Sequence, residues 1–456
     1  MTELRDKRVS VIGLAREGTD LARFLVAEGA SVLVNDARPV EKLADRLREL
    51  EGLPIQFVLG GHPPTPTLDA DLLFVSPGVP PELPLLKEAR ARGIPISSGT
   101  QLFFERCPAP IVGITGSSGK TTTTTLVGRI FQQAGCHTLV GGNIGVPLLG
   151  RLPEITPDSR VVLELSSFQL EPMTASPHIA AITNITPNHL DRHITMEAYT
   201  AAKSQILAHQ RHSDIAVLNA DDPGSAGLRP VGQVIRFSVG RPVAGTYLDG
   251  ERLVLDRGNG PQTICLRSEL QLPGLHNVAN VLTACAIASA AGLDIEAMRA
   301  AATTFSGVRH RLELVAEVDG VQYVNDSIAT APERSLAALA VYAGTPVVLL
   351  AGGRDKHLPM DEWAEVIARE ARALITFGEA APLIEAAALK AGLPDDRIHQ
   401  AGTVDRAVGI ARQVSRPGDV VLLSPGGTSY DQYQDFEERG DHFAAVVRAS
   451  GTRRDA

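Results

Sequence analysis

The sequence contains few cysteines, no long hydrophobic run and no recognisable targeting segment. Its four cysteines are scattered over 456 residues, without a Cys-x-x-Cys pair or a nearby histidine spacing that is typical of zinc sites. They are expected to be small buried side chains in a reducing compartment. Nowhere do about 18 apolar residues follow one another, and the charged segment Met1–Lys7 leads directly into a strand-like run. Neither a membrane span nor a signal peptide is predicted, and the expected location is the cytoplasm.

Positive charge is also scarce relative to negative charge. The chain has 43 basic and 52 acidic side chains, which gives a formal net charge of -9. This balance argues against a nucleic acid or an anionic membrane surface as the main partner, so any phosphate group must be bound at a local site. With 44% hydrophobic and 21% charged residues, the chain can form ordinary globular cores.

Strand-like and helix-like segments alternate along the chain, and no fixed-period repeat or low-complexity linker interrupts them. Length alone predicts about two to four domains. From Val9 the order of strand, glycine-containing loop, helix and strand predicts a parallel βαβ unit, and similar blocks follow. We therefore predict an α/β protein of three domains. They are a Rossmann-like domain over residues 1–105, a central α/β domain over 106–306 and a Rossmann-like α/β domain over 307–456.

A phosphate-binding loop is predicted in the segment ITGSSGKTT, residues 114–122, between a strand and a helix. Glycines allow backbone N–H groups to turn toward phosphate oxygens, and the helix N-terminus adds partial positive charge. Lys120 is expected to neutralise the terminal phosphates of a nucleotide and Thr121 to present its hydroxyl to Mg²⁺. The strict P-loop pattern is not met, because Ile114 stands where its first glycine should be. The alternative is a Gly/Ser turn before an ordinary helix, which the strand–loop–helix context disfavours.

A second glycine-containing loop lies near the N-terminus. Gly13 and Gly18 fit a dinucleotide-binding pattern, but Ala15 occupies the middle position, where the backbone must approach a pyrophosphate. Asp36 follows the second strand about where a ribose-binding acid would lie. An NAD-dependent dehydrogenase is therefore a rival hypothesis, against which the phosphate loop counts. Protection from thermal unfolding by NAD, or by ATP-Mg²⁺ or a uridine nucleotide, would distinguish the two.

Candidate metal ligands follow the strands after the phosphate loop. Glu164 ends one strand, and Asn188-His189 follows another. Mg²⁺ prefers oxygen ligands and is often held by one or two side chains and the phosphates. Taken alone, Glu164 could equally be an ion-pair partner, His189 a loop cap and Lys203 a solvated helix lysine.

Ordered motifs run through nearly the whole chain. They are SPGV at Ser76, TGSSGKTT at Thr115, GGNIG at Gly141, ELSSFQLE at Glu164, NHLDRH at Asn188, AAK at Ala201, GLHNVAN at Gly274, HR at His310, NDSIAT at Asn325 and SPGGTSYDQYQDFEERG at Ser424. In this order they resemble the Mur ligases of peptidoglycan synthesis, most closely the branch that adds D-glutamate to UDP-N-acetylmuramoyl-L-alanine.

The resemblance implies an ATP-dependent ligase in which the first domain binds the UDP-linked substrate, a central P-loop-type ATPase domain binds ATP with Mg²⁺, and the last domain binds the amino acid. The expected active species is a monomer. The implied catalytic residues are Lys120, His189 and Lys203, and the implied Mg²⁺ ligands are Thr121, Glu164, His189 and a carbamylated Lys203. The implied ATP contacts are Thr115, Gly116, Ser117, Ser118, Gly119, Lys120, Thr121, Thr122, Asn277, Asn280, Arg311 and Asp326. The implied contacts of the UDP-linked substrate are Leu14, Ala15, Asp36, Arg38, Ser76, Pro77, Gly78, Asn143, Ser166 and Gln169. The implied glutamate contacts are Thr330, Lys356, Ser429 and Phe436.

Two positions depart from this resemblance. Ile328 stands where better-known members have a lysine near the amino acid, and Ser118 replaces the usual asparagine of the phosphate loop. Loss of a cation beside a dicarboxylate leaves L-glutamate open as the substrate, and another Mur-type or folylpolyglutamate-type amide ligase is a further alternative. A nucleotide-gated switch that binds a partner protein is the alternative outside enzymes, and stoichiometric phosphate release would exclude it.

Overall fold

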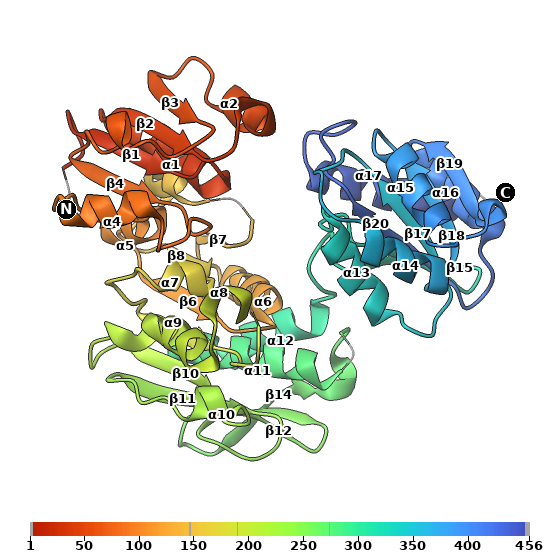
Figure 1. Ribbon diagram of the computed structural model, residues 1–456. Coiled ribbons are helices and arrows are strands. Elements are labelled where there is room, and N and C mark those ends of the chain that lie inside the picture. Colours follow the sequence, from red (N-terminus) through yellow and green to blue (C-terminus); the bar gives the residue numbers. More distant parts are fainter. Residues whose placement is uncertain (1–2, 146, 189, 273, 452–456) are drawn as a thin grey trace. The chain divides into compact units, whose positions relative to one another are not determined.

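The computed structural model describes residues 3–145, 147–188, 190–272 and 274–451, and it divides into two compact units, Met1–Phe305 and Ser306–Ala456. The first unit contains two sheets and the second contains one. Figure 1 shows the first unit in red to green and the second in green-blue to blue. The predicted α/β class is confirmed, because helices and strands alternate around three mostly parallel sheets.

The first sheet is a five-stranded parallel sheet in the order β3-β2-β1-β4-β5. Its strands are β1 (Arg8–Ile12), β2 (Ser31–Asp36), β3 (Ile55–Leu59), β4 (Leu72–Val75) and β5 (Ile96–Ser97). The helices are α1 (Arg16–Ala27), α2 (Ala44–Glu49), α3 (Pro64–Thr67), α4 (Pro84–Ala91) and α5 (Gly99–Arg106), with a 3-10 turn η1 (Val40–Leu43). The strand order reverses between β1 and β4, so the loops after these strands border the crevice where open α/β sheets bind ligands.

The second sheet has nine strands in the order β14-β13-β12-β11-β10-β9-β6-β8-β7. Its strands are β6 (Ile111–Thr115), β7 (Thr138–Gly142), β8 (Arg160–Glu164), β9 (Ile179–Ile182), β10 (Ile215–Asn219), β11 (Gln233–Ser238), β12 (Gly245–Asp249), β13 (Arg252–Asp256) and β14 (Pro261–Leu266). The strands from β7 to β12 are parallel, and only the β12–β13 and β13–β14 pairs are antiparallel. Parallel strands buried on both faces explain the continuous apolar runs of β6, β8 and β9.

Helices follow the strands of this sheet, and one core joins it to the first sheet. The helices are α6 (Lys120–Gln133), α7 (Ser167–Leu170), α8 (Leu190–His193), α9 (Met196–Ala208), α10 (Pro223–Ala226), α11 (Leu275–Ala290) and α12 (Ile295–Thr304), with 3-10 turns η2 (Leu149–Glu154) and η3 (Arg267–Glu269). A single cluster of buried side chains runs from Leu21 and Leu25 of α1 through Phe103 of α5 to Leu149 and Leu163. This shared core explains why both sheets form one compact unit.

The third sheet forms the second unit, in the order β15-β16-β20-β17-β18-β19, with only the β15–β16 pair antiparallel. Its strands are β15 (Glu313–Val318), β16 (Val321–Asn325), β17 (Val347–Gly352), β18 (Ala371–Phe377), β19 (Ile398–Gly402) and β20 (Val420–Gly426). Its helices are α13 (Pro332–Val341), α14 (Asp361–Glu370), α15 (Ala381–Lys390), α16 (Val404–Val414) and α17 (Phe436–Gly451), with a 3-10 turn η4 (Asp395–Arg397). Separate apolar clusters cover its two faces.

Sequence periodicity identified the central strands but not several edge strands. The strands β3, β5, β7, β15 and β19 were not predicted, and each lies at a sheet edge. An edge strand is less buried, so its apolar pattern is weak, as in the partly exposed β3. The domain boundaries 1–105, 106–306 and 307–456 stay predictions. In the described part of the chain, no helix has the length and apolar character needed to cross a bilayer.

Candidate active site

The phosphate loop is a sharp turn between β6 and α6 that only glycine can make at two places. Gly116 has φ 155° and Gly119 has φ 77°. A Cβ on Gly116 would lie 1.8 Å from Thr183 Oγ1, and one on Gly119 would lie 2.3 Å from Asn280 Oδ1. Both positions therefore require a residue without a side chain. The loop directs backbone N–H groups at the start of a 14-residue helix toward one place, as an anion site needs.

Side chains of the β9 end hold this loop in position. Thr183 Oγ1 donates to Ser118 O at 2.7 Å, and Asn184 Oδ1 accepts from Ser118 N at 3.0 Å. Ser117 Oγ donates to Thr186 O at 2.8 Å. No role was predicted for this segment from the sequence. A Thr-Asn pair directly after an apolar strand, beside a glycine-rich loop, is the signal that could have identified it.

Lys120 and Lys203 both lie over the turn. Lys120 Nζ donates to Gly116 O at 2.9 Å and to Ser117 O at 3.2 Å, while Lys203 Nζ donates to Gly116 O at 2.8 Å. Lys203 is buried, with 2% of its surface exposed, and its ammonium lies 4.7 Å from the centre of the Tyr199 ring. Burial and the charge of Lys120 lower the pKa of Lys203 to about 7, against an opposing effect of Glu164. The prediction of a solvated lysine from the residue alone is wrong for Lys203.

Oxygen-bearing side chains meet where β8 ends beside α6. Thr121 Oγ1 donates to Glu164 Oε2 at 2.8 Å, and Asn143 Nδ2 donates to Glu164 Oε1 at 2.7 Å. The Glu164 carboxylate is buried, at 2% exposure. A hydroxyl and a buried carboxylate beside a phosphate loop are hard donors of the kind that Mg²⁺ uses, so the residues present fit this metal.

Lys203 and His189 were expected as further metal ligands, and Lys203 lies over the same loop. In the described ranges no three His, Cys, Asp or Glu side chains come together as a metal-binding group. His189 lies outside the described residues.

Two asparagines of α11 border the phosphate loop from the other side. Asn280 Oδ1 accepts from Thr123 Oγ1 at 3.5 Å, and Asn280 Nδ2 donates to Asn277 Oδ1 at 3.4 Å. Both residues were expected to contact the nucleotide, and the structure brings them to the phosphate loop. The other two expected nucleotide contacts, Arg311 and Asp326, belong to the second unit.

The N-terminal loop is closed by Asp36, which follows β2. Its carboxylate accepts from Leu14 N at 2.7 Å and from the guanidinium of Arg38 at 2.8 and 2.9 Å. Burial alone would raise the pKa of Asp36, but the hydrogen bonds from Arg38 and Leu14 lower it overall. Ser76 Oγ donates to Gly13 O at 2.7 Å. At the carboxyl ends of β1, β2 and β4 the structure therefore brings together four expected residues, Leu14, Asp36, Arg38 and Ser76. Of the other expected residues, Ala15 directly precedes α1, and Pro77 and Gly78 follow Ser76.

The second unit gathers its expected residues around the loop after β16. Lys356 Nζ donates to Thr330 Oγ1 at 3.1 Å. Asp326 accepts from Ser424 Oγ at 2.8 Å and from Leu312 N at 3.2 Å, and burial raises its pKa to about 6. Ser429 is buried after β20, and Phe436 begins α17 and accepts through its carbonyl from Ser327 Oγ at 2.8 Å.

A fully buried arginine, missed by the sequence analysis, ties these loops together. Arg439 of α17 donates to Ser327 O at 2.9 Å, to Ser327 Oγ at 3.0 Å and to Gly427 O at 3.2 Å. Burial lowers its pKa to about 10. It lies in the charged run DFEERG, and nothing local in the sequence indicated its burial.

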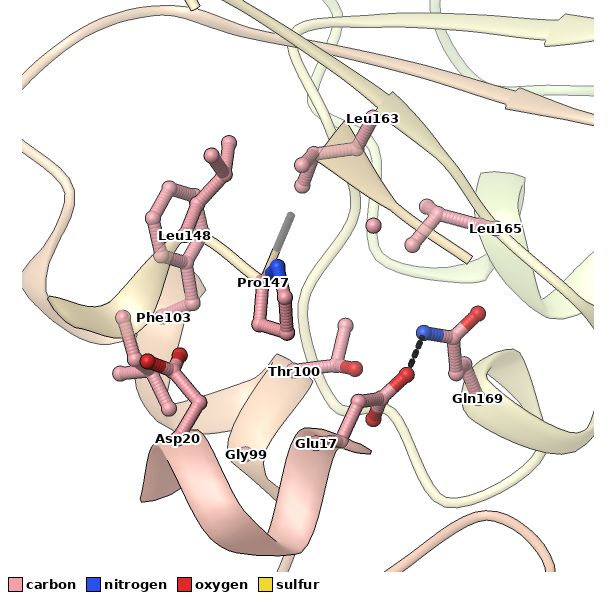
Figure 2. Close-up of a pocket in the computed structure, with 12 residues that line it drawn as sticks. Glu17, Asp20, Gly99, Thr100, Phe103, Pro147, Leu148, Leu163, Leu165 and Gln169 are labelled. Carbon is pink, nitrogen blue, oxygen red and sulfur yellow. Dashed lines mark hydrogen bonds between the residues drawn. The ribbon is translucent and has the colours of Figure 1, made fainter. Parts of the chain in front are cut away.

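A cavity lies between α1, α5 and the β8–α7 segment, and it contains a second residue that was missed. Figure 2 shows Glu17 of α1 pointing to Gln169 of α7, whose Nε2 donates to Glu17 Oε1 at 2.5 Å. Gln169 also accepts through Oε1 from Ser166 N at 2.8 Å and from Ser166 Oγ at 2.9 Å. Burial raises the pKa of Glu17 to about 7. The sequence signal that could have identified Glu17 is an acidic residue between Gly13 and Gly18.

Comparisons with known proteins cover most of the chain. Residues 7–98 match the family domain described as Mur ligase MurD-like, N-terminal domain, residues 114–288 match the Mur ligase middle domain, and residues 310–427 match the Mur ligase, glutamate ligase domain. The UDP-N-acetylmuramoylalanine--D-glutamate ligase of Symbiobacterium thermophilum is 44% identical over 450 residues, which cover 97% of this chain and 98% of that protein. The protein of the same name in Pelotomaculum thermopropionicum is 43% identical over 445 residues, which cover 97% of each chain.

Solved structures support the same architecture. The crystal structure of UDP-N-acetylmuramate-alanine ligase MurC from Thermotoga maritima is similar with a TM-score of 0.53 and 20% identity, covering 97% of this chain and 100% of that chain. A crystal structure of MurF from Acinetobacter baumannii gives a TM-score of 0.53 and 19% identity, covering 98% and 92%. At this identity the likeness concerns the fold alone.

Proposed function

The chain belongs to the Mur ligase family, and from this premise we propose that it joins D-glutamate to UDP-N-acetylmuramoyl-L-alanine at the expense of ATP. The names of its relatives supply the two substrates. The observation that carries the chemistry is the meeting of Lys120, Thr121 and Glu164 at one phosphate loop. The reaction contributes to the synthesis of peptidoglycan precursors.

The reaction requires activation of a carboxylate, because a free carboxylate is a poor electrophile for an amine. The terminal carboxylate of the UDP-linked substrate attacks the γ-phosphorus of ATP, the bond from that phosphorus to the bridging oxygen breaks, and ADP leaves. The amine of glutamate then attacks the carbonyl carbon of the acyl phosphate, loses a proton, and inorganic phosphate leaves through a tetrahedral intermediate. Lys120 stabilises negative charge on the transferred phosphoryl group, since such transfers are catalysed mainly by positioning and electrostatics.

Magnesium would be held by Thr121 and Glu164, with His189 as a further candidate. Mg²⁺ supplies charge neutralisation and orientation of the phosphate oxygens. The buried contact of the Thr121 hydroxyl with the Glu164 carboxylate supports this assignment. Asn143 holds the other oxygen of Glu164 and so orients the carboxylate.

Carbamylation of Lys203 is part of the proposal. A lysine must be neutral to attack CO₂, and the lowered pKa of Lys203 makes the neutral amine available near neutral pH. A carbamate would replace a buried ammonium, which repels Mg²⁺, with an anionic oxygen donor. The proximity of Lys203 to Gly116 O supports a role at this loop.

Glutamate would be bound in the second unit by Thr330, Lys356, Ser429 and Phe436. The contact between Lys356 and Thr330 supports this group, because a cation and a hydroxyl are suited to a carboxylate. Ile328 in the same loop supplies no charge. Asp326 and Arg311 are proposed nucleotide contacts from this unit.

The UDP-linked substrate would bind along the carboxyl ends of the first sheet and continue toward β8. The loop contacts are Leu14, Ala15, Asp36, Arg38, Ser76, Pro77 and Gly78, and the muramoyl-alanine contacts are Asn143, Ser166 and Gln169. The hydrogen bond between Glu17 and Gln169 supports a continuous site, because it connects the two groups. We place the reaction in the cytoplasm, where ATP is available, with a monomer as the active species and no nucleic acid partner.

The deciding experiment measures phosphate release with ATP-Mg²⁺ and UDP-N-acetylmuramoyl-L-alanine, with D- and L-glutamate offered separately. We expect stoichiometric release with D-glutamate and little with L-glutamate. Preference for L-glutamate would select the alternative stereochemistry. Release with another amino acid or with a pterin substrate, and none with glutamate and the UDP-linked substrate, would reject the proposed substrates.

A further inference from the structure

We propose that Glu17 is a positioning residue for the UDP-linked substrate: its carboxylate holds the side-chain amide of Gln169 and thereby fixes the β8–α7 segment against α1. This inference rests on the proposed function, in which Gln169 contacts the muramoyl-alanine part of the substrate. Glu17 is not among the expected substrate contacts, although it lies within the same Gly13–Gly18 segment as Leu14 and Ala15. Its role follows from the hydrogen bonds around Gln169.

The orientation of the Gln169 amide is determined by Ser166. Gln169 Oε1 accepts from Ser166 N and from Ser166 Oγ, and Gln169 N in turn donates to Ser166 Oγ at 3.2 Å. This capping box requires the oxygen of the amide at Ser166, so the Nε2 group must point away from α7. The amide nitrogen is therefore a donor that faces the cavity.

The cavity offers Glu17 as the acceptor for that donor. Its space of about 420 Å³, part of it open to solvent, is lined mainly by apolar side chains such as Leu148, Leu163 and Leu165. Figure 2 shows Glu17 and Asp20 entering this space from α1, with the bond to Gln169 drawn from Glu17. An amide nitrogen in such surroundings without an acceptor would lose a hydrogen bond that water no longer supplies. Only one of its two N–H groups is needed for Glu17, so the other can serve a ligand.

The Gln169 segment leads directly to the candidate reaction centre. Glu164 ends β8, Ser166 caps α7, and Gln169 lies in the single turn of α7. His193 Nε2 contacts Ser167 Oγ at 2.9 Å, which anchors the same turn on its other side. A shift of α7 would therefore move both the substrate-facing amide and the residues next to Glu164. Glu17 connects this segment to the N-terminal loop that is proposed to hold the diphosphate.

A carboxylate at this position is costly for the folded protein, which argues for a functional reason to keep it. Burial disfavours the charge of Glu17 more than its hydrogen bond with Gln169 favours it, as its raised pKa indicates. The charged groups that face Glu17 are Arg16 and Asp20, both on its own helix. The other lining residues from α5, the β7–β8 connection and α7 carry no charge. An apolar residue would suit this cavity better, if packing were the only requirement.

The test compares two replacements of Glu17 that have a similar length. Methionine accepts a hydrogen bond only weakly, whereas glutamine accepts one well. Glu17→Met keeps the length of the side chain and suits an apolar cavity, while Glu17→Gln keeps an acceptor oxygen without the charge. We expect Glu17→Met to raise KM for the UDP-linked substrate about tenfold, the equivalent of one buried hydrogen bond to a charged group. Its KM for ATP should stay within about twofold. Glu17→Gln should recover KM for the UDP-linked substrate to within about threefold.

Two controls separate this role from simple packing. Asp20→Leu changes the other carboxylate of the same cavity without touching Gln169, and its KM for the UDP-linked substrate should stay unchanged. In a Gln169→Leu background, Glu17→Met should add less than about twofold, because the two residues act through one bond. A normal KM for Glu17→Met, equal damage by Glu17→Gln, or full additivity with Gln169→Leu would overturn the proposal. Wild-type phosphate release with the proposed substrates is measured in parallel, so failure of the proposed function is recognised separately from failure of the role of Glu17.

Discussion

The hydroxyl of Thr121 donates a hydrogen bond to the buried carboxylate of Glu164 across 2.8 Å, and so joins the first turn of α6 to the end of β8. The two residues are 43 positions apart in sequence, and the parallel pairing of β6 with β8 brings them together.

Lys120→Ala should abolish most of the activity while the protein stays folded. Loss of one preorganised charge at a transferring group typically lowers kcat by about 10² to 10³. The measurement is phosphate release with D-glutamate and the UDP-linked substrate, together with the thermal midpoint. Lys390→Ala is a matched control, because Lys390 is an exposed helix lysine that pairs only with the exposed Asp361 among the described residues. Turnover near the wild-type value in Lys120→Ala would show that the phosphate loop is assigned to the wrong chemistry.

Lys203→Ala should be inactive and should regain part of its activity in the presence of a short carboxylic acid. The small acid would occupy the volume of the lost side chain and supply the anionic oxygen that a carbamate would otherwise present. Wild-type protein from which CO₂ has been removed should lose activity and recover it with bicarbonate. The measurement is phosphate release with and without acetate or bicarbonate. Rescue by acetate of Lys120→Ala to the same extent would indicate a nonspecific anion effect.

Lys356→Ala should raise KM for glutamate far more than KM for ATP. Loss of a hydrogen-bonded cation that faces a carboxylate costs about 1.5–3 kcal/mol, so we expect roughly 10- to 100-fold for glutamate. Steady-state kinetics with each substrate varied in turn provides the measurement. Lys356→Arg keeps the charge and serves as the comparison. Equal changes in both KM values would reject an amino-acid role for Lys356.

The fold was largely predictable from the sequence, whereas the site was predictable only where side chains act locally. The phosphate loop follows from adjacent residues, so Lys120 and Thr121 could be assigned roles without a structure. Lys203 could be assigned a role only through the family resemblance, because its burial arises from packing of α9 against the distant β6 turn. Glu17 and Arg439 were missed for the same reason, since each contacts a segment more than 100 residues away.

Stability should depend on pH through Glu17. Burial raises its pKa from 4.5 to about 7, so the folded state binds the proton more tightly than the unfolded state. The contribution of Glu17 to the stability of the folded state is therefore fully present below its unfolded pKa of 4.5 and is lost as pH rises. Above about pH 7 the folded state carries the full cost of the buried charge. Glu17→Gln should have a higher thermal midpoint than wild type at about pH 8 and no advantage at about pH 4.5.

An acid with the opposite shift provides the control for this experiment. The hydrogen bond from Arg151 lowers the pKa of Glu154. Glu154→Gln should therefore lose stability relative to wild type at high pH, or show no change, but should not gain it. A pH-independent difference between Glu17→Gln and wild type would contradict the raised pKa of Glu17.

Gly119→Ala should weaken binding of ATP-Mg²⁺. Gly135→Ala serves as the control variant. The two glycines have nearly the same φ, with values of 77° and 76°. Alanine should cost each about 1 kcal/mol of folding free energy, because an L-residue is strained at positive φ. A Cβ on Gly119 would lie 2.3 Å from Asn280 Oδ1, whereas one on Gly135 meets nothing within 4 Å. Only Gly119→Ala must displace either the Asn280 side chain or the N–H groups of the loop. Calorimetric titration should therefore find weaker ATP-Mg²⁺ binding in this variant alone. Equal nucleotide affinity in both variants would mean that Asn280 yields without disturbing the loop, and that the close contact has no role in nucleotide binding.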